Sequence, residues 1–534
     1  MYKDIKLPEI PEAERRPLVD QLIGLIQALA ETAQRQAEEI AQLKDEIAVL
    51  KKQKKRPKLR PSKMDEETDA AGDQDQKTSK RGTSSQTSKK TKDLKIHETQ
   101  VVKAEGVPEG AAFKGYQDFV VQDLQFQPNN TCYRLEQWVG ADGKYVIADP
   151  PANGHYGPTL VSFVLHQYYH QHVTQPLLLE QLKALGFKIS AGTLNTLLTE
   201  DKALFHQEKA ALLEAGKAVS RYLQTDDTGA RHQGKNGYCT YIGNDLFAWF
   251  ESTSSKSRIN FLSLLRAGHD DYVINAGALD YLRHQRLPSA KIELLETARE
   301  TVFANHTAWQ AHLAALGIRG KRHTAIATEG ALMGSLLAHG LSPEIAIVSD
   351  DAGQFNVFHH ALCWIHAERL IHRLIPLNDE QRQAQQQVRE QIWALYADLK
   401  RYKAAPDQGL KDELLARFEA LCATRTCFET LNQALKRLHK NQSELLLILE
   451  KPWLPLHNNL SENDIRDYVK KRKISGSTRS ELGRQCRDTF ASLKKTCRKH
   501  AISFWDFLQD RVSGKNALPP LPELVRRAAH VSPQ

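Results

Sequence analysis

The sequence predicts an α/β protein, and three carboxylates mark the part of the chain that predicts it best. A short strand-like run ends in Asp226, and a β-branched run typical of a buried strand ends in Asp350. Farther along, two asparagines that favour the start of a helix precede Glu462, and apolar residues follow at helical spacing. These patterns predict a core of sheet and helices in which two strands and one helix each present an acid.

Residues 1–50 predict a long helix with a heptad seam. Positions on the seam recur at alternating steps of three and four residues: Val19, Leu22, Ile26, Leu29, Ala33, Gln36, Ile40, Leu43, Ile47 and Leu50. This spacing predicts a coiled coil with a partner helix. Because Ala33 is small and Gln36 is polar, a single amphipathic helix that folds back on the core is the alternative.

Residues 51–98 combine lysine clusters with acids, Ser, Thr, Gly and Gln, and contain few apolar residues. Such a segment buries too little apolar surface to offset the entropy of ordering, so we expect a disordered, basic linker. Its lysines would add nonspecific affinity for DNA, although a charge-rich linker is more often simply solvated.

The segment from 99 to 150 predicts a small β-rich module. Short runs of β-branched and aromatic residues lie at 119–121, 132–135 and 144–147, and turn residues separate them. We therefore expect three short strands in this module.

Residues 151–218 predict a helical domain that resembles a helix-turn-helix. Its helices are expected at 160–169, 176–185 and 191–198, with a turn at 186–190. The third helix contains no Lys or Arg, so a purely structural helical bundle is an equal alternative. If the domain binds DNA, Lys183 and Lys188 would contact the phosphate backbone.

The main core is expected to start at residue 219 and to be interrupted once. Its first part covers 219–375, with further strands at 238–242 and 246–250 and a helix at 257–267. Residues 376–450, rich in Gln, Arg, Leu and Ala, predict a mostly helical insertion between the second and third acids. Residues 451–512 complete the core with basic helices, and 513–534 form a C-terminal tail.

A strand-end acid taken alone is more often a turn former or a helix cap than a catalytic group. Three acids together have a chemical rationale, because Mg²⁺ prefers hard oxygen ligands and keeps several waters. Two such ions about 4 Å apart stabilise the attacking and leaving oxygens of an in-line phosphoryl displacement. Asp226, Asp350 and Glu462 are therefore candidate catalytic residues and metal ligands.

Three motifs contain these acids: Asp226-Asp227-Thr228, then Asp350-Asp351-Ala352 with Cys363-Trp364-Ile365-His366-Ala367-Glu368-Arg369, then Asn458-Asn459-Leu460-Ser461-Glu462-Asn463-Asp464-Ile465-Arg466. Their order and spacing resemble those of the insertion sequence 66 family of bacterial transposases, over roughly residues 150–512. The resemblance implies a ribonuclease H-like core with an Asp-Asp-Glu triad that cleaves and joins phosphodiester bonds at transposon ends. It also implies two Mg²⁺ ions per active site, for which Mn²⁺ would substitute.

The chain departs from the family pattern without losing an acid. His457, Asn463, Asp351 and Ala352 stand where the family usually has Asp, Arg, Gly and Tyr. We take Asp226 and Asp350, rather than the aspartates that follow them, because they match the family positions. Many members also carry a four-cysteine zinc module before the core, whereas residues 96–150 contain one cysteine, so that module is absent or degenerate here.

Residues near the second acid are candidates for assisting catalysis. His366 is the leading auxiliary catalytic residue, and Arg369 would face the metal or the scissile phosphate. Cys363 and His366 also suggest a zinc pair, but no matching pair stands close by. A packed helix in which Cys363 is buried is the interpretation that we favour.

The segment after the third acid is strongly basic. Between Arg466 and Lys499 there are twelve Lys or Arg and three acids. A helical basic segment beside a metal site would hold the phosphate backbone of DNA. The candidate DNA contacts in this segment are Arg466, Lys470, Lys471, Arg472 and Lys473.

Composition agrees with an intracellular partner of DNA. The balance of 73 Lys and Arg against 64 Asp and Glu gives a net charge of +9, which by itself only permits a polyanionic partner. Scattered cysteines, no secretory signal and no apolar run near the roughly 20 residues that span a bilayer predict a cytoplasmic protein, without membrane contact, that joins the nucleoid when bound to DNA.

The expected partners are transposon-end and target DNA, a second copy of the chain bound through residues 19–50, and accessory proteins of the same element. Two other functions stay open. The chain could be a catalytically silent DNA-binding regulator, or a non-transposing metal-dependent nuclease on the same scaffold, because a fold alone does not fix a function.

Overall fold

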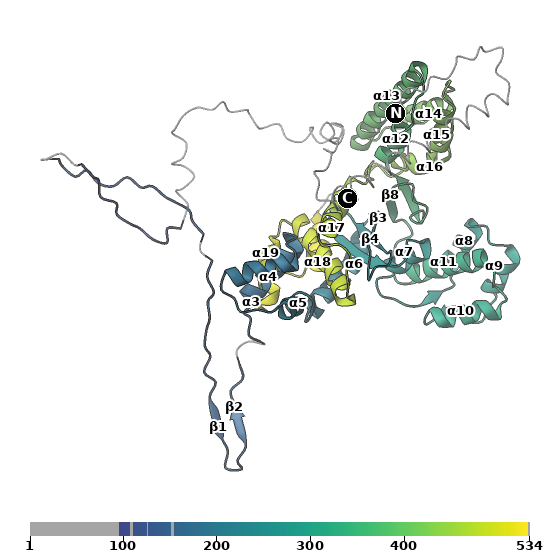
Figure 1. Ribbon diagram of the computed structural model, residues 1–534. Coiled ribbons are helices and arrows are strands. Elements are labelled where there is room, and N and C mark those ends of the chain that lie inside the picture. The colour runs from purple at the N-terminus through teal and green to yellow at the C-terminus, as the bar shows by residue number, and fades with distance from the viewer. Residues whose placement is uncertain (1–94, 107–110, 125, 151–153, 532–534) are drawn as a thin grey trace. The chain divides into compact units, whose positions relative to one another are not determined.

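The structure is a computed structural model that describes residues 95–106, 111–124, 126–150 and 154–531 (Figure 1). These residues fall into two units that divide between Asn129 and Asn130, and each is described by itself. The predicted coiled coil and nearly all of the predicted linker lie outside the described residues, so both stay predictions. In the described part of the chain, no helix is long and apolar enough to cross a membrane.

The segment predicted as a β-rich module contains one hairpin among its described residues. Strands β1 (Gln137–Val139) and β2 (Tyr145–Ile147) pair antiparallel around a turn in which Gly143 has a φ of 77°. The strands predicted at 119–121 and 132–135 are wrong, since these residues have no strand structure. Almost all of their side chains are exposed, and β-branched residues favour a strand chiefly where neighbouring strands or a core cover them.

Helices follow in the segment that resembles a helix-turn-helix. They are α3 (Pro158–Leu165), the π-helical turn η3 (His166–His170), α4 (Gln175–Ala184), α5 (Ala191–Thr199) and the longer α6 (Ala203–Val219). Helix α5 packs on α3 and α4, and leucines at 178, 182, 194 and 198 are fully buried there. Ser190 caps α5, because its hydroxyl accepts a hydrogen bond from Thr193 N at 3.0 Å.

The C-terminal residues close this helical domain. Helix α19 (Phe504–Val512) packs on α3, and α20 (Leu521–Val531) packs on α6 with Leu521 fully buried. Arg511 of α19 and Glu208 of α6 form an ion pair at 3.0 Å. The prediction of a C-terminal tail is therefore wrong for the described residues. They form a helix whose apolar face packs against α6.

The core is one mixed sheet in the order β5–β4–β3–β8–β9 (Figure 1). Strand β4 (Tyr238–Gly243) pairs antiparallel with both β3 (Tyr222–Gly229) and β5 (Ala248–Thr253). Strand β8 (Ala346–Ser349) pairs parallel with β3, and β9 (His359–Leu362) pairs parallel with β8. The chain is thus a mixed α/β protein. The sequence predicted four of these strands and missed β9, in which two histidines interrupt the apolar pattern.

Between β5 and β8 the chain forms a group of helices with a two-stranded ribbon. The elements are α7 (Arg258–Leu265), β6 (Tyr272–Val273), α8 (Ala276–His284), α9 (Ser289–Glu296), β7 (Val302–Phe303), α10 (His306–Ala315) and α11 (Lys321–Ala338). Helix α11 packs against α7, α8 and β6. The packing is close at Gly334, where an added Cβ would collide with the carbonyl oxygen of Val273.

After β9 a second helical group precedes the return to the core. It consists of α12 (Trp364–His372), α13 (Asp379–Ala404), α14 (Gln408–Ala423), α15 (Glu429–Lys440) and α16 (Gln442–Leu445). These helices bury an apolar cluster of their own that includes Ile392, Leu399 and Phe418. Hydrogen bonds still tie the group to the sheet, since Glu444 accepts from Asn356 at 2.6 Å and lies 2.9 Å from His360 Nδ1.

Two long helices end the core. Helix α17 (Asn459–Ser475) contacts β3 and β4, and α18 (Glu481–Lys499) packs on β5. Asp488 of α18 is fully buried and accepts hydrogen bonds from Ser252 N at 2.8 Å and from the Tyr468 hydroxyl at 2.9 Å. These bonds hold both helices against the antiparallel half of the sheet.

Candidate active site

The sheet sets two of the three acids side by side. Strands β3 and β8 pair parallel with Gln224 opposite Val348, so Asp226 and Asp350 follow at matching positions two residues later. Adjacent strands lie about 4.8 Å apart, and side chains in register point to the same face. The two carboxylates therefore emerge next to each other at one end of the sheet.

Glu462 reaches the same region because the start of α17 is tied to β3. The buried side chain of Gln224 accepts a hydrogen bond from Ser461 N at 3.2 Å and donates one to the His457 carbonyl at 3.3 Å. Ser461 also donates to the Asn458 carbonyl at 2.7 Å. The sequence predicted that Asn458 caps this helix, but its side chain forms no capping hydrogen bond.

The crowding of the acids appears in the pKa of Asp226, which is raised to about 7. Burial is the largest cause, and the charges of Asp350 and Glu462 raise the pKa further, against a hydrogen bond from the Asp227 amide that lowers it. Asp226 therefore lies within electrostatic reach of both other acids. The structure brings all three predicted acids to one region.

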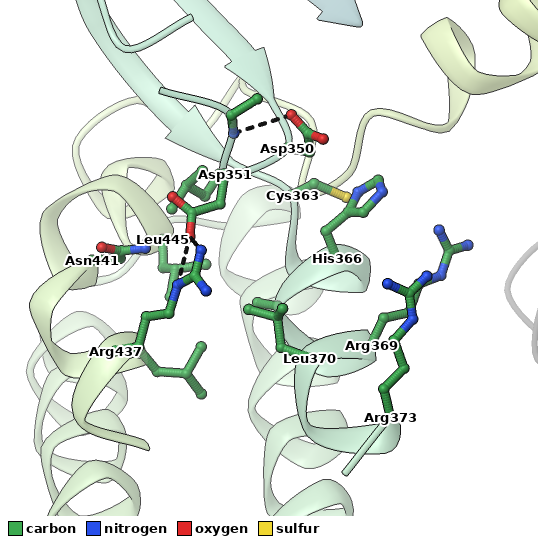
Figure 2. Close-up of a pocket in the computed structure, with 14 residues that line it drawn as sticks. Asp350, Asp351, Cys363, His366, Arg369, Leu370, Arg373, Arg437, Asn441 and Leu445 are labelled. Carbon is green, nitrogen blue, oxygen red and sulfur yellow. Dashed lines mark hydrogen bonds and ion pairs between the residues drawn. The ribbon is translucent and has the colours of Figure 1, made fainter. Parts of the chain in front are cut away.

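Three basic side chains surround the carboxylate of Glu462. Arg369 lies 3.1 Å from it, His366 3.4 Å and Arg466 3.4 Å. Burial lowers the pKa of His366, and the charge of Glu462 opposes this effect. His366 and Arg369 are one turn apart on α12 (Figure 2), so this helix presents both side chains towards the third acid.

The aspartates that follow Asp226 and Asp350 have side-chain partners of their own. Asp227 accepts hydrogen bonds from Thr240 Oγ1 at 2.5 Å and from Gln354 Nε2 at 3.0 Å. Asp351 accepts one from Arg437 Nε at 2.8 Å (Figure 2). By contrast, among the described residues the carboxylates of Asp226 and Asp350 accept hydrogen bonds from backbone amides alone.

Cys363 has a packing role in this region. Its buried Sγ accepts a hydrogen bond from Asn458 N at 3.5 Å, and burial raises the pKa of the thiol to about 11. The next residue, Trp364, donates its backbone amide to the Leu456 carbonyl at 3.0 Å. Together these contacts fasten the start of α12 to the loop before α17, which agrees with a packed helix and not with a zinc pair.

One cluster in the described part of the chain offers three nitrogen or oxygen ligand atoms within 4.8 Å of one another. It consists of His269, Asp271 and His339, from the loop before β6 and the end of α11. The rings of the two histidines stack face to face at 3.6 Å, so their lone pairs do not converge on one ion as they stand. Asp226, Asp350 and Glu462 do not form such a cluster among the described residues, so their ligand atoms do not all lie within 4.8 Å of one another.

The basic stretch after Glu462 divides into buried and exposed cations. Its buried members are Lys471, Arg487, Lys494 and Lys495. Lys494 pairs with Asp467, and both Lys495 and Lys499 pair with Asp464, at 3.4 and 3.0 Å. The stretch therefore offers DNA fewer free cations than its sequence indicates, because ion pairs inside the fold neutralise much of its charge.

Two of the predicted DNA contacts point into the protein. Lys471 is 4% exposed, donates to the Tyr168 carbonyl at 2.7 Å and lies 3.4 Å from the centroid of the Tyr168 ring. Burial lowers its pKa to about 7. Arg472 donates to Thr228 Oγ1 at 3.2 Å and to the Gly229 carbonyl at the end of β3.

The other candidate DNA contacts are accessible. Arg466, Lys470 and Lys473 are exposed on α17, and Lys183 and Lys188 are exposed on either side of the turn between α4 and α5. These five residues keep their predicted role as candidate phosphate contacts, together with the half-buried Arg369.

DNA affinity distinguishes the exposed from the buried lysines. Lys470→Ala is expected to weaken binding to a labelled duplex about two- to fivefold and to lower the salt slope by about 1, because one phosphate contact is lost. Lys471→Met is expected to change neither quantity, because the Lys471 ammonium faces Tyr168. Fluorescence anisotropy at several salt concentrations measures both, and an equal loss in the two variants would contradict the buried position of Lys471.

Sequence analysis missed three residues that position the site. Gln224 gave a weak signal, since it is a long polar residue between Leu223 and Thr225 in the buried part of a strand. Gln354 and Arg437 gave none, because the aspartates that they contact lie 127 and 86 residues away along the chain. Pairs so distant in sequence are recognisable only in the folded protein.

Comparison with known proteins gave two matches. A model of the transposase IS66 family matches residues 335–486, which include Asp350, His366 and Glu462 but not Asp226. An uncharacterised protein of Sinorhizobium fredii, y4jO, is 42% identical over 321 residues, which cover 60% of this chain and 100% of that protein.

Proposed function

Because this chain belongs to the IS66 family of transposases, we propose that it cleaves and joins phosphodiester bonds at the ends of its own mobile element. Asp226, Asp350 and Glu462 are the catalytic acids of this proposal. The observation that carries it is the raised pKa of Asp226, whose causes include the charges of both other acids. Crowded, partly buried carboxylates of this kind are typical of functional sites.

We further assign the core to the ribonuclease H-like class. The strand order β5–β4–β3–β8–β9, with an antiparallel half and a parallel half, supports the assignment. It puts Asp226 on the central strand and Asp350 after the adjacent strand, while the bonds of Gln224 bring Glu462 towards them.

The acids fit divalent cations. Asp226, Asp350 and Glu462 would hold two Mg²⁺ ions, or Mn²⁺ in their place, through hard carboxylate oxygens. When bound, the ions supply charge that activates the attacking oxygen and stabilises the leaving oxygen. Three acids that share two ions about 4 Å apart need not place all their ligand atoms within 4.8 Å of one another. A divalent charge would also offset the repulsion that raises the pKa of Asp226.

The cations around Glu462 have two roles in this proposal. Arg369 and Arg466 hold the carboxylate in the free protein and can neutralise phosphate oxygens once DNA is bound. His366 is the auxiliary residue. Burial lowers its pKa, which favours the neutral imidazole that can accept a proton from the attacking water or 3'-hydroxyl. No covalent intermediate with the protein is required.

DNA would be held by exposed cations on two elements. Lys470 and Lys473 extend the contacts of Arg466 along α17, and Lys183 and Lys188 would contact the backbone beside α5. Two copies of the chain, joined through residues 19–50, would hold two transposon ends together. Target DNA and accessory proteins of the element complete the proposed assembly.

A cleavage assay on the DNA that flanks the coding sequence tests the proposal. We expect terminal inverted repeats in that DNA, and cleavage at their ends in Mg²⁺ but not in EDTA. Tight, specific binding without cleavage in Mg²⁺ or Mn²⁺ would favour a silent regulator. Hydrolysis that is indifferent to sequence would favour a nuclease, and either result would overturn the transposase mechanism.

A further inference from the structure

A pocket opens beside the second acid, between the core and the helical insertion. It has a volume of about 250 Å³, several times the roughly 30 Å³ that a water molecule occupies. Asp350 and His366 line one side, and residues of α15 and α16 line the other (Figure 2). The pocket therefore has room for a ring-sized group directly next to the proposed active site.

The lining combines an apolar interior with cations. Leu362, Leu438 and Leu445 are buried in its wall, and Leu370 is half-buried. Three arginines line it: Arg369 of α12, Arg373 directly after that helix, and Arg437 of the facing helix α15 (Figure 2). No Phe, Tyr or Trp is among the lining residues, and the imidazole of His366 is the one aromatic ring there. Apolar walls with a few convergent polar groups are typical of ligand sites.

The arginines differ in what they contact. Arg369 pairs with Glu462, and Arg437 pairs with Asp351, so both guanidinium groups have an acid within the protein. Arg373 is exposed and forms no hydrogen bond or ion pair with any described side chain. It is the C-cap residue of α12, four positions after Arg369. A guanidinium without an acidic partner, at the mouth of a pocket, is suited to a phosphate.

The insertion is fixed in place where it builds the pocket. The indole of Trp364 donates to the Leu445 carbonyl at 2.8 Å, and Arg437 and Glu444 bond to residues that follow β8 and precede β9. These bonds hold α15 and α16 against the core. The pocket is thus a built feature in which two distant parts of the chain each supply half of the wall.

We propose that this pocket receives one unpaired nucleotide of the DNA substrate, next to the phosphate that is cleaved. The base lies against the leucines, and the phosphate of that nucleotide lies on Arg373 and Arg369. The inference rests on the proposed function, because it takes the substrate to be DNA. In this proposal the helical insertion helps to bind a nucleotide that is no longer stacked in the DNA duplex.

A fluorescent base reports this event. Stacking on neighbouring bases quenches 2-aminopurine, and only the small imidazole of His366 is among the lining residues to replace that stacking. The probe is a duplex with a single-stranded overhang that carries 2-aminopurine as its first unpaired nucleotide, bound in EDTA so that no cleavage occurs. We expect its fluorescence to rise about threefold or more when the wild-type protein saturates the DNA.

Variants of the pocket link the signal to its lining. Arg373→Ala should reduce the affinity for the overhang probe several-fold and should not disturb folding, because the side chain is exposed. Leu370→Trp should abolish the rise by filling the pocket with an indole. The matched control is Arg382→Ala, an exposed arginine of α13 that is not among the lining residues. A rise that neither pocket variant changes would overturn the proposal.

A free nucleotide has the same chemistry as an unpaired one in DNA, and competition separates the two. Deoxyadenosine monophosphate should not displace the overhang at equal concentration; if it does, the pocket takes a free nucleotide and the inference is wrong. The fluorescence is measured without metal, so the pocket can be tested even if the protein never cleaves DNA. Conversely, metal-dependent cleavage without any fluorescence change would refute the pocket and leave the proposed function standing.

Discussion

Glu462→Gln is expected to abolish DNA cleavage, by on the order of 10³-fold or more, while DNA affinity stays within about twofold. The substitution removes one negative charge from the proposed metal-binding acids but keeps the length of the side chain. Its amide oxygen can still accept a hydrogen bond from Arg369, which now lies 3.1 Å from the carboxylate. The start of α17 is held by Gln224 and Ser461, not by Glu462, so the local fold should persist.

The measurement is the initial rate of strand cleavage in Mg²⁺, with affinity determined separately by anisotropy in EDTA. Glu481→Gln is a matched control, because Glu481 also lies in the first turn of its helix and pairs with a nearby arginine. That variant should cleave at the wild-type rate. Loss of binding by Glu462→Gln, or cleavage at a near-normal rate, would remove Glu462 from the catalytic acids.

Asp226→Asn is expected to inactivate the protein and, without metal, to stabilise its fold at pH 8. In the folded state the pKa of Asp226 is raised from 3.8 to about 7, so the folded protein holds this proton more tightly than the unfolded chain does. Stability is therefore lost as the pH rises from about 4 to about 7, and the full loss remains above pH 7. Asparagine carries no charge and avoids this loss.

Thermal unfolding in EDTA at pH 5 and pH 8 measures the effect. At pH 8 the variant should unfold a few degrees higher than the wild type, which corresponds to on the order of 1 kcal/mol or more. The difference should shrink at pH 5. Mg²⁺ or Mn²⁺ should raise the melting temperature of the wild type and leave that of the variant nearly unchanged, because ligand binding stabilises only a fold that keeps its site.

Asp351→Asn is the matched control for this prediction. Asp351 follows Asp350 in the same loop, but its carboxylate accepts a hydrogen bond from Arg437 at 2.8 Å. Neutralising it should leave stability unchanged or lower it at pH 8, the opposite sign from Asp226→Asn. A higher melting temperature in both variants would indicate a general effect of net charge and would argue against a strained acid at position 226.

Local patterns predicted much of the core. Four strands of the sheet and the helix of Glu462 were predictable because a strand alternates or buries its residues over a short run and a helix repeats them within a few residues. The motifs around Asp226, Asp350 and Glu462 led to the IS66 family in the same way. Once β3 and β8 pair in parallel, their register brings Asp226 beside Asp350.

Predictions failed where the outcome depends on partners far along the chain. The runs at 119–121 and 132–135 form no strand, because nothing in the described structure pairs with them. Strand β9 was missed because its histidines face partners that the sequence does not identify, such as Glu444. The terminal helix α20 was predicted as a tail because the sequence does not show that its apolar face packs against α6.

The sequence by itself determined the acids, their order and the elements that carry them, because those signals are local. Only the tertiary structure decided which charges are available for a ligand. Lys471 looks like Lys470 in the sequence, yet one faces Tyr168 and the other faces solvent. Burial and ion pairing depend on residues that are hundreds of positions apart, so the fold alone separates the cations that hold the protein together from those that can hold DNA.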